Sequence, residues 1–339
     1  MGKKFLLRLL LCLFVLFATR RDPDASAATK IVFAYASVVA RTTFIWIAQE
    51  QGFFGKYGID PQLILMSRGP VLIAALTSGD VQVGNTGGTA ALSAALGGAD
   101  VKVIGTFNSR WTNNIVARPG IHTPKDLAHK HFGLSSLGGT QWMGAMLWLE
   151  HLGLEVRKDD VRFLVIGDQS LLVQALERGN IDAAMLDSGF SRRMKEKGFS
   201  VLTDSSRVNL PIVSQGLVLR AEYARKQPHI VEGVLQALIE GLAFTVAPMN
   251  KPIVLRTMMK RLRLTEPAAA EEGYQEILTA LDRKPYPSLE GMKNIQRLLR
   301  TREPRLAEVN VETLIDDSFM RKLDASGFID RAYSNYGVR

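Results

Sequence analysis

This chain of 339 residues contains a single cysteine, Cys12, which lies in an apolar run near the N-terminus. The run covers residues 5–18 and is shorter than the roughly 20 apolar residues that a membrane-spanning helix needs. Basic side chains precede it, and Ala-Ser-Ala at 25–27 offers a cleavage site, so the pattern predicts a signal peptide over 1–27. Cys12 lacks the small residues that precede a lipid-carrying cysteine, which favours a soluble exported product over a lipoprotein.

After cleavage the chain would contain no cysteine, which excludes disulfides, thiol catalysis and cysteine metal sites. Export without disulfides is typical of a bacterial periplasm more than of a small secreted scaffold. The formal charge of +9 falls to +6, because residues 1–27 carry five basic and two acidic side chains. The remaining charges are scattered and no aromatic-basic platform accompanies them, so we expect no nucleic-acid partner.

Histidine is also scarce, with five copies. Zinc needs three or four ligands in a defined geometry, no cysteine is available, and successive side chains of the strand start from His129 to His131 point to opposite faces. Even with His122 nearby, we expect no metal site and no cofactor. Around Ser135 and Ser136 no sequence motif marks a histidine as a catalytic partner, so we expect no catalytic residue and no enzyme; the alternative is that the fold brings a partner side chain close to them.

What the chain does contain is an alternation of short apolar runs with amphipathic stretches. This alternation predicts parallel strand–helix units and an α/β fold, and the length favours two domains. From residue 222 onward the pattern is mostly helical, with the longest stretch at 229–247. The predicted strands are 30–35, 60–66, 81–85, 101–107, 131–136, 161–167 and 181–187, and the predicted helices are 42–54, 70–79, 89–98, 123–130, 140–153 and 169–179.

Two segments about one hundred residues apart share a pattern. "ALTSGDVQVGNTGGTAAL" (75–92) and "LLVQALERGNIDAAMLDSG" (171–189) both place a helix end and a glycine before a short strand. Either convergent turn chemistry or two similar lobes would explain the match. In two similar lobes, ligands bind beyond the carboxyl ends of the strands. At an offset of 100, Leu72, Ala75, Leu76 and Gly79 correspond to Leu172, Ala175, Leu176 and Gly179.

Gly-Gly-Thr occurs at 87–89 and again at 138–140, each time between a predicted strand and a predicted helix. A helix start leaves backbone N–H groups without intrahelical partners, and glycine lets a ligand approach them. The helix dipole favours an anion or a carbonyl oxygen at this position. The pair therefore indicates one binding loop in each lobe.

The sequence resembles the nitrate, taurine and alkanesulfonate class of periplasmic substrate-binding proteins. "AQEQGFFGKYGIDPQLIL" (48–65) is similar to the class signature G-F-F-x-K-x-G-[IL]-[DE], and residues 74–105 and 170–186 are similar to its first-lobe and second-lobe blocks. The segments 286–299 and 314–330 resemble the C-terminal part of soil-bacterial members. The likeness covers essentially the whole chain after residue 27.

The resemblance implies a type II periplasmic binding fold, in which each lobe is a mixed sheet flanked by helices and a helical region forms the C-terminus. It further implies a monomer in the periplasm that binds a small organic anion or a heteroaromatic solute of the thiamine-pyrimidine kind. Such a protein delivers its solute to an ABC permease in the inner membrane. An enzyme or a ligand sensor on the same fold is the alternative, although the cysteine-rich motif of the yeast-type pyrimidine synthase is missing.

The expected domain limits follow from the restart of the pattern after the first lobe. We expect lobe 1 over 28–115, lobe 2 over 116–213, and a return to lobe 1 with the helical C-terminal region over 214–339. The resemblance and the strand ends together give the candidate ligand-binding residues. These are Tyr35, Ser37, Arg41, Asn85, Thr86, Gly87, Gly88, Asn108, Ser136, Gly138, Gly139, Thr140, Gln141, Asp187 and Ser188.

Two charged candidates have competing explanations. Arg41 could meet a carboxylate or a sulfonate through two hydrogen bonds, or could be exposed to solvent. Asp187 would repel an anion but would bind an amine or a ring N–H, or it could cap a neighbouring backbone group. The sequence therefore leaves the charge of the solute open.

Overall fold

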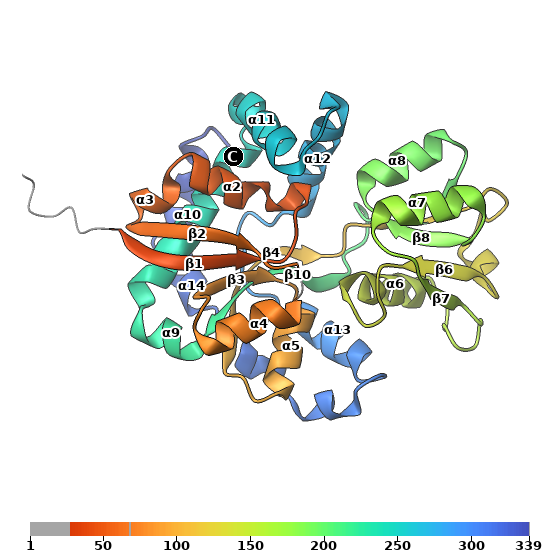
Figure 1. Cartoon of the computed structure of the whole chain (residues 1–339), viewed down its shortest axis with the longest axis horizontal. Helices are drawn as coiled ribbons and strands as arrows, with labels where there is room; N and C mark the ends of the chain where they lie inside the picture. The colour runs from red at the N-terminus through yellow and green to blue at the C-terminus, as the bar shows by residue number, and fades with distance from the viewer. Residues whose placement is uncertain (1–27, 68, 339) are drawn as a thin grey trace, which may run out of the picture.

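The computed structural model describes residues 28–67 and 69–338, so the predicted signal peptide lies outside the described residues. Two lobes, each built on one five-stranded sheet, lie side by side (Figure 1). Strand order in the first sheet is β2 (Ile59–Leu65), β1 (Thr29–Tyr35), β3 (Val83–Thr86), β10 (Pro211–Arg220) and β4 (Val101–Arg110). The second sheet has the order β7 (Arg162–Val165), β6 (His131–Leu134), β8 (Ala183–Leu186), β5 (Asn114–Ala117) and β9 (Ser200–Val201).

Helices cover both sheets and form the C-terminal region. The first lobe carries α2 (Thr43–Glu50), α3 (Phe53–Lys56), α4 (Gly69–Ser78) and α5 (Gly88–Leu96), and the second carries α6 (Thr140–His151), α7 (Gln169–Arg178) and α8 (Ser188–Glu196). The C-terminal helices are α9 (Ala221–Lys226), α10 (Pro228–Val246), α11 (Lys251–Leu262), α12 (Pro267–Ala280), α13 (Leu289–Leu299), α14 (Ser318–Ala325) and α15 (Phe328–Ser334). Short 3-10 turns are η1 (Ala40–Thr42), η2 (Pro124–Leu127), η3 (Pro248–Asn250), η4 (Pro304–Glu308) and η5 (Val311–Leu314).

The α/β fold and the helical C-terminal region predicted from the sequence are confirmed. The chain crosses between the lobes twice, from β4 to β5 and from β9 to β10. On its return, β10 pairs antiparallel with both β3 and β4, which makes the first sheet mixed. The predicted domain limits at residues 116 and 213 fall inside β5 and β10. Strands β5 and β9 were not predicted, because each is short and lies beside a crossing.

The hundred-residue repeat corresponds to matched elements in the two lobes. α4 and α7 end at residues 78 and 178, β3 and β8 cover 83–86 and 183–186, and α5 and α8 begin at 88 and 188. The four matched leucines are buried in both lobes. Gly79 and Gly179 have φ angles of 92° and 77°, a left-handed conformation that glycine adopts without strain and that ends a helix.

The predicted helix 123–130 is shorter in the structure. Thr123 and Asp126 form a capping box that starts the turn η2, but the turn ends at Leu127. Two residues later His129 has a φ of 61°, which is incompatible with continued helix. The element therefore begins where the sequence predicted a helix, but the predicted length was wrong.

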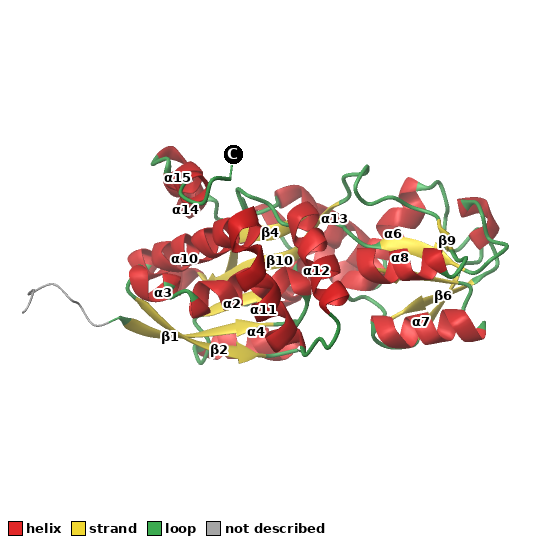
Figure 2. Ribbon diagram, turned by 90° about the horizontal axis from the view of Figure 1, so that it is seen from above, coloured by secondary structure: helices red, strands yellow, loops and turns green. Residues whose placement is uncertain are grey.

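The apolar core is continuous through the connection between the lobes. One cluster joins Leu72 and Val103 of the first lobe to Phe132 and Trp148 of the second, and Trp111 in the crossing belongs to it. Figure 2 shows α12 and α13 of the C-terminal region at the junction of the lobes. Among the described residues one helix, α10, is long and apolar enough to cross a membrane, but 78% of its apolar window is buried inside the protein. The junction is therefore packed, and α10 forms the centre of the first lobe.

A buried carboxylate fixes the C-terminal end of the chain to α10. The Glu240 carboxylate accepts hydrogen bonds from Lys56 Nζ at 2.7 Å, Tyr57 Oη at 2.5 Å and Tyr336 Oη at 3.0 Å. Burial raises the pKa of Glu240, but these three hydrogen bonds outweigh it and bring the pKa below its usual range. The ionised form is thus favoured in the folded protein.

We expect Glu240→Gln to lower the free energy of unfolding at pH 7 by about 1–3 kcal/mol, because three donors lose a charged acceptor. A depressed folded-state pKa contributes stability above the unfolded-state pKa of about 4.5, and the contribution is lost as the pH falls below it. Urea unfolding of both proteins between pH 3 and pH 7 should therefore show a difference that shrinks toward acid pH. Glu222→Gln, at an exposed ion pair with Lys226, is the matched control and should change stability by less than about 0.5 kcal/mol. A constant difference across this range would contradict the assignment.

Candidate functional site

A cavity of about 1420 Å³ lies between the two lobes. Its wall includes the ends of β1 and β3, the starts of α4 and α5, the crossing residues and the loop before α6. Both predicted Gly-Gly-Thr loops reach this wall from opposite lobes. Nine of the candidate residues line the cavity: Ser37, Arg41, Thr86, Gly87, Ser136, Gly138, Gly139, Thr140 and Gln141. Their role as ligand contacts remains a prediction.

The helix starts at the cavity and beside it differ in how they are capped. The N-cap residues of α7, whose start also lines the cavity, and of α8 are Asp168 and Asp187, whose carboxylates accept hydrogen bonds from Leu171 N and Phe190 N. The N-cap residues of α5 and α6 are Gly87 and Gly139, and neither makes a side-chain cap. The first N–H groups of α5 and α6 therefore have no side-chain cap, and they follow two glycines that line the cavity, which makes them candidates for binding an acceptor oxygen.

The two loops approach each other across the cavity. A Cβ atom on Gly87 would lie 3.0 Å from Thr140 Oγ1 in the other lobe, so glycine permits this approach. Gln141 fixes the second loop, because its Oε1 accepts from Ser135 N at 2.6 Å and its Nε2 donates to the Met185 carbonyl at 3.0 Å. Gln141 is thus a positioning residue with both ends of its amide bonded inside the protein.

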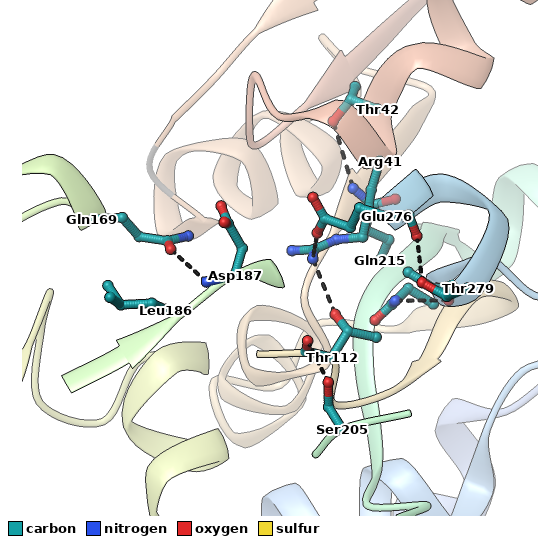
Figure 3. Close-up of polar contacts among 12 residues, drawn as sticks. Arg41, Thr42, Thr112, Gln169, Leu186, Asp187, Ser205, Gln215, Glu276 and Thr279 are labelled. Atoms are coloured by element: carbon teal, nitrogen blue, oxygen red, sulfur yellow. Dashed lines mark hydrogen bonds and ion pairs between the residues drawn. The ribbon is translucent and has the colours of Figure 1, made fainter. Parts of the chain in front are cut away.

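Arg41 is the one cation among the lining residues that the structure describes, a set that leaves out position 68. Its Nη1 donates to Thr112 Oγ1 at 3.1 Å and forms a buried ion pair with Glu276 of α12 (Figure 3). Burial raises the pKa of the Glu276 carboxyl; Arg41 lowers it, and the charge of Asp187 raises it further. The guanidinium is therefore neither exposed nor a free anion receptor, because Glu276 already opposes its charge.

Asp187 caps its own helix. Its Oδ1 accepts from Phe190 N at 2.9 Å, and its backbone N–H donates to Gln169 Oε1 at 2.7 Å. Figure 3 places Asp187, from the second lobe, across from Arg41 and Glu276 of the first. Asp187 is not one of the residues that line the cavity, but its negative charge raises the pKa of Glu276 on the opposite side.

Five other candidates also lie outside the cavity wall. Gly88 is packed beneath α13, where an added Cβ would lie 2.6–2.9 Å from Met292, Ile295 and Val213, so helix packing requires glycine at this position, and a ligand contact of its backbone stays a prediction. The other four candidates lie elsewhere in the fold. Tyr35 packs edge-on against Trp46, Asn85 is buried with its carbonyl bonded to Ala36 N, Asn108 donates to the Ala280 carbonyl, and Ser188 is an exposed first residue of α8.

Several lining residues were not among the sequence candidates. Trp111 and Asn113 come from the first crossing, Ser214 and Gln215 from β10, and Gln169 from the start of α7. Gln215 is only 4% exposed and stands in the strand sequence "SQGLVLR". A glutamine in an otherwise apolar buried strand is unusual, and this was the available signal that a polar group is needed there.

Ion pairs connect the lobes on two flanks of the cavity. Arg192 and Arg193 of α8 lie 2.5 Å and 3.6 Å from the Glu272 carboxylate of α12. The Arg297 guanidinium of α13 binds both oxygens of Glu150 in α6, at 2.9 Å and 2.8 Å. The structure thus shows the lobes in contact through α12 and α13, the two helices at the junction in Figure 2.

Metal-binding groups do not gather in the part of the chain that the structure describes, where no set of three His, Cys, Asp or Glu could hold an ion. His129 and His131 instead lie near different aspartates, Asp160 and Asp182.

The fold and the cavity define a two-lobe α/β protein with a site between its lobes. Residues 40–250 match the family model described as NMT1/THI5 like, and because this is more than half of the chain, the protein belongs to that family. The resemblance to substrate-binding proteins noted in the sequence is confirmed at this level.

A similar curated protein is the taurine-binding periplasmic protein of Escherichia coli strain K12, with 27% identity over 58% of this chain and 61% of that protein. The chain thus spans about three fifths of that relative's length. The structure of the periplasmic aliphatic sulphonate binding protein SsuA from Escherichia coli has a TM-score of 0.69 at 19% identity, covering 86% of this chain and 98% of that one. The desulfurization enzyme DSZB has a TM-score of 0.62 at 15% identity, covering 88% and 99%. These two likenesses show the fold.

We expect Gly87→Asn to weaken solute binding while leaving the protein folded. Asparagine is a favourable N-cap residue, but here it would occupy the free N–H groups of α5 and meet Thr140 across the cavity. Binding by calorimetry and unfolding in urea should be measured together.

The same change at the neighbouring glycine is the matched control. Gly88→Asn should lower the free energy of unfolding by about 1–3 kcal/mol, because the side chain would overlap Met292, Ile295 and Val213. Wild-type affinity in Gly87→Asn would remove the start of α5 from the binding site.

Proposed function

We propose that this protein is the solute-binding component of an ABC importer and that it binds a small polar organic solute between its lobes. The observation that carries the proposal is the cavity with one uncapped helix start from each lobe. Backbone N–H groups at α5 and α6 would hold the acceptor oxygens of the solute. Family membership and the similarity to the taurine-binding protein support this use of the cavity.

The same proposal includes the place and the partner. Export through the signal peptide predicted over 1–27 would bring the chain to the periplasm, where it would act as a monomer. Solute binding would shift an existing equilibrium toward the closed arrangement of the lobes, and that arrangement would dock on a permease in the inner membrane. No bond of the solute is broken in this cycle.

An enzyme or a sensor on the same fold is the second candidate. The observation that favours an enzyme is the fold that the chain shares with the desulfurization enzyme DSZB. The importer component and the enzyme differ in what happens to the solute. An importer component returns it unchanged after incubation, whereas an enzyme converts it, and mass spectrometry of the released molecule separates the two.

We expect a thermal-shift screen of the purified chain from residue 28 to identify a stabilising solute. The panel should contain taurine, alkanesulfonates, nitrate, aminopyrimidines, aromatic acids and their primary amides. At about 100 times its dissociation constant, a true solute should add about 2.7 kcal/mol to the free energy of unfolding. Gly87→Asn should lose this gain. The absence of any stabilising compound across the panel would overturn the proposal.

A further inference from the structure

A group of buried polar side chains lies in the first lobe beside the cavity. Thr42 and Thr43 stand at the start of α2, Asn85 lies in β3, Asn108 lies in β4 and Gln215 lies in β10. Each of the five is at most 4% exposed. Because β10 pairs Gln215 with Asn108, and Gln215 Nε2 reaches Thr42, the strand ends and the helix start form one polar cluster.

Several polar atoms of this cluster have no hydrogen-bond partner among the described residues. They include Asn85 Nδ2, Asn108 Oδ1 and Gln215 Oε1. A buried polar atom without a partner costs free energy, and native proteins contain few of them. Of these three residues, Gln215 is the one that lines the cavity. Its amide is therefore the point where the cluster meets a bound solute.

The orientation of the Gln215 amide follows from its neighbour. Thr42 Oγ1 has a single hydrogen, which it donates to the Ser37 carbonyl at 3.1 Å. Toward Gln215 it can then only accept, so the amide turns its Nε2 to Thr42 at 3.5 Å. The amide oxygen of Gln215 is left as the free group, and a free oxygen needs a hydrogen-bond donor.

Donors lie on the same wall. Arg41 Nε and Trp111 Nε1 are buried, have no partner among the described residues, and belong to residues that line the cavity. The positive charge of Arg41 is already opposed by Glu276, and Asp187 adds a negative charge across the cavity (Figure 3). A solute group at this wall therefore meets an acceptor and donors together, without a net positive charge from the described side chains.

We propose that Gln215 selects solutes whose polar head both donates and accepts hydrogen bonds, such as a primary carboxamide or sulfonamide, over heads that only accept, such as a carboxylate or sulfonate. The proposal rests on the proposed binding function and narrows its solute class. The head would donate an N–H to Gln215 Oε1 and accept from Arg41 Nε–H or Trp111 Nε1–H. An acceptor-only anion would leave Gln215 Oε1 unpaired and place a second oxygen against it.

The test compares pairs of probes with one skeleton and two heads. Calorimetry on the chain from residue 28 should use benzamide with benzoate, benzenesulfonamide with benzenesulfonate, and propanesulfonamide with propanesulfonate. We expect the amide of each pair to bind about tenfold or more tightly. Equal or tighter binding of the anions would overturn the selectivity while leaving the proposed function intact. No binding by any probe or by any compound of the wider panel would overturn both.

Three variants test whether Gln215 causes the preference for amides over anions. Gln215→Met keeps the shape and removes the acceptor, so the preference for amides should be lost. Gln215→Glu keeps an acceptor oxygen, so the preference should persist. Gln141→Met is the matched control, because that amide is bonded at both ends inside the second lobe and its loss should weaken both members of a pair alike. Thermal melts of each variant without probe confirm folding, and an unchanged preference in folded Gln215→Met would overturn the assignment.

Discussion

The buried ion pair between Arg41 and Glu276 is the interaction on which the arrangement of the cavity depends. Arg41 follows β1, Glu276 comes from α12, and Thr112, which the same guanidinium contacts, lies in the crossing between the lobes. One side chain thus joins the first lobe, the C-terminal region and the connection. Removing either charge would leave the other buried and unpaired, which typically costs about 3–5 kcal/mol. Because Glu276 opposes the charge of Arg41, the described residues give the cavity wall a guanidinium group but no excess positive charge.

The two lobes use one arrangement of strand, turn and helix for two purposes. β3 leads through Gly87 into α5, and β8 leads through Asp187 into α8, one hundred residues apart. In the second lobe the aspartate accepts a hydrogen bond from Phe190 N at the start of its helix; in the first the glycine provides no side-chain cap. The free helix start opposite Gly87 comes from α6 instead, because Gly139 leads into it. The cavity is therefore asymmetric although the lobes share a fold.

The sequence predicted what depends on local pattern and failed where neighbours come from far along the chain. The spacing of Leu72, Leu76 and Gly79 predicted the repeat, because helix periodicity and a left-handed glycine act within a few residues. Gly88 gave the same local signal as Gly87, yet α13, two hundred residues later, covers it. Gln215 was missed because its role depends on Thr42 and on the cavity, neither of which lies near it in the sequence.

The ion pairs on the two flanks of the cavity contribute only a small part of the free energy that holds the lobes together. Arg192–Glu272 and Arg297–Glu150 are partly exposed, and exposed pairs typically contribute about 0.2–1 kcal/mol each. A two-state equilibrium needs about 5.5 kcal/mol of differential binding to move from 1:99 to 99:1. The ion pairs can therefore bias the lobes but cannot hold them closed alone. Under the proposed function, the larger part would come from a solute that contacts both lobes at once, through the helix starts of α5 and α6 and the amide of Gln215.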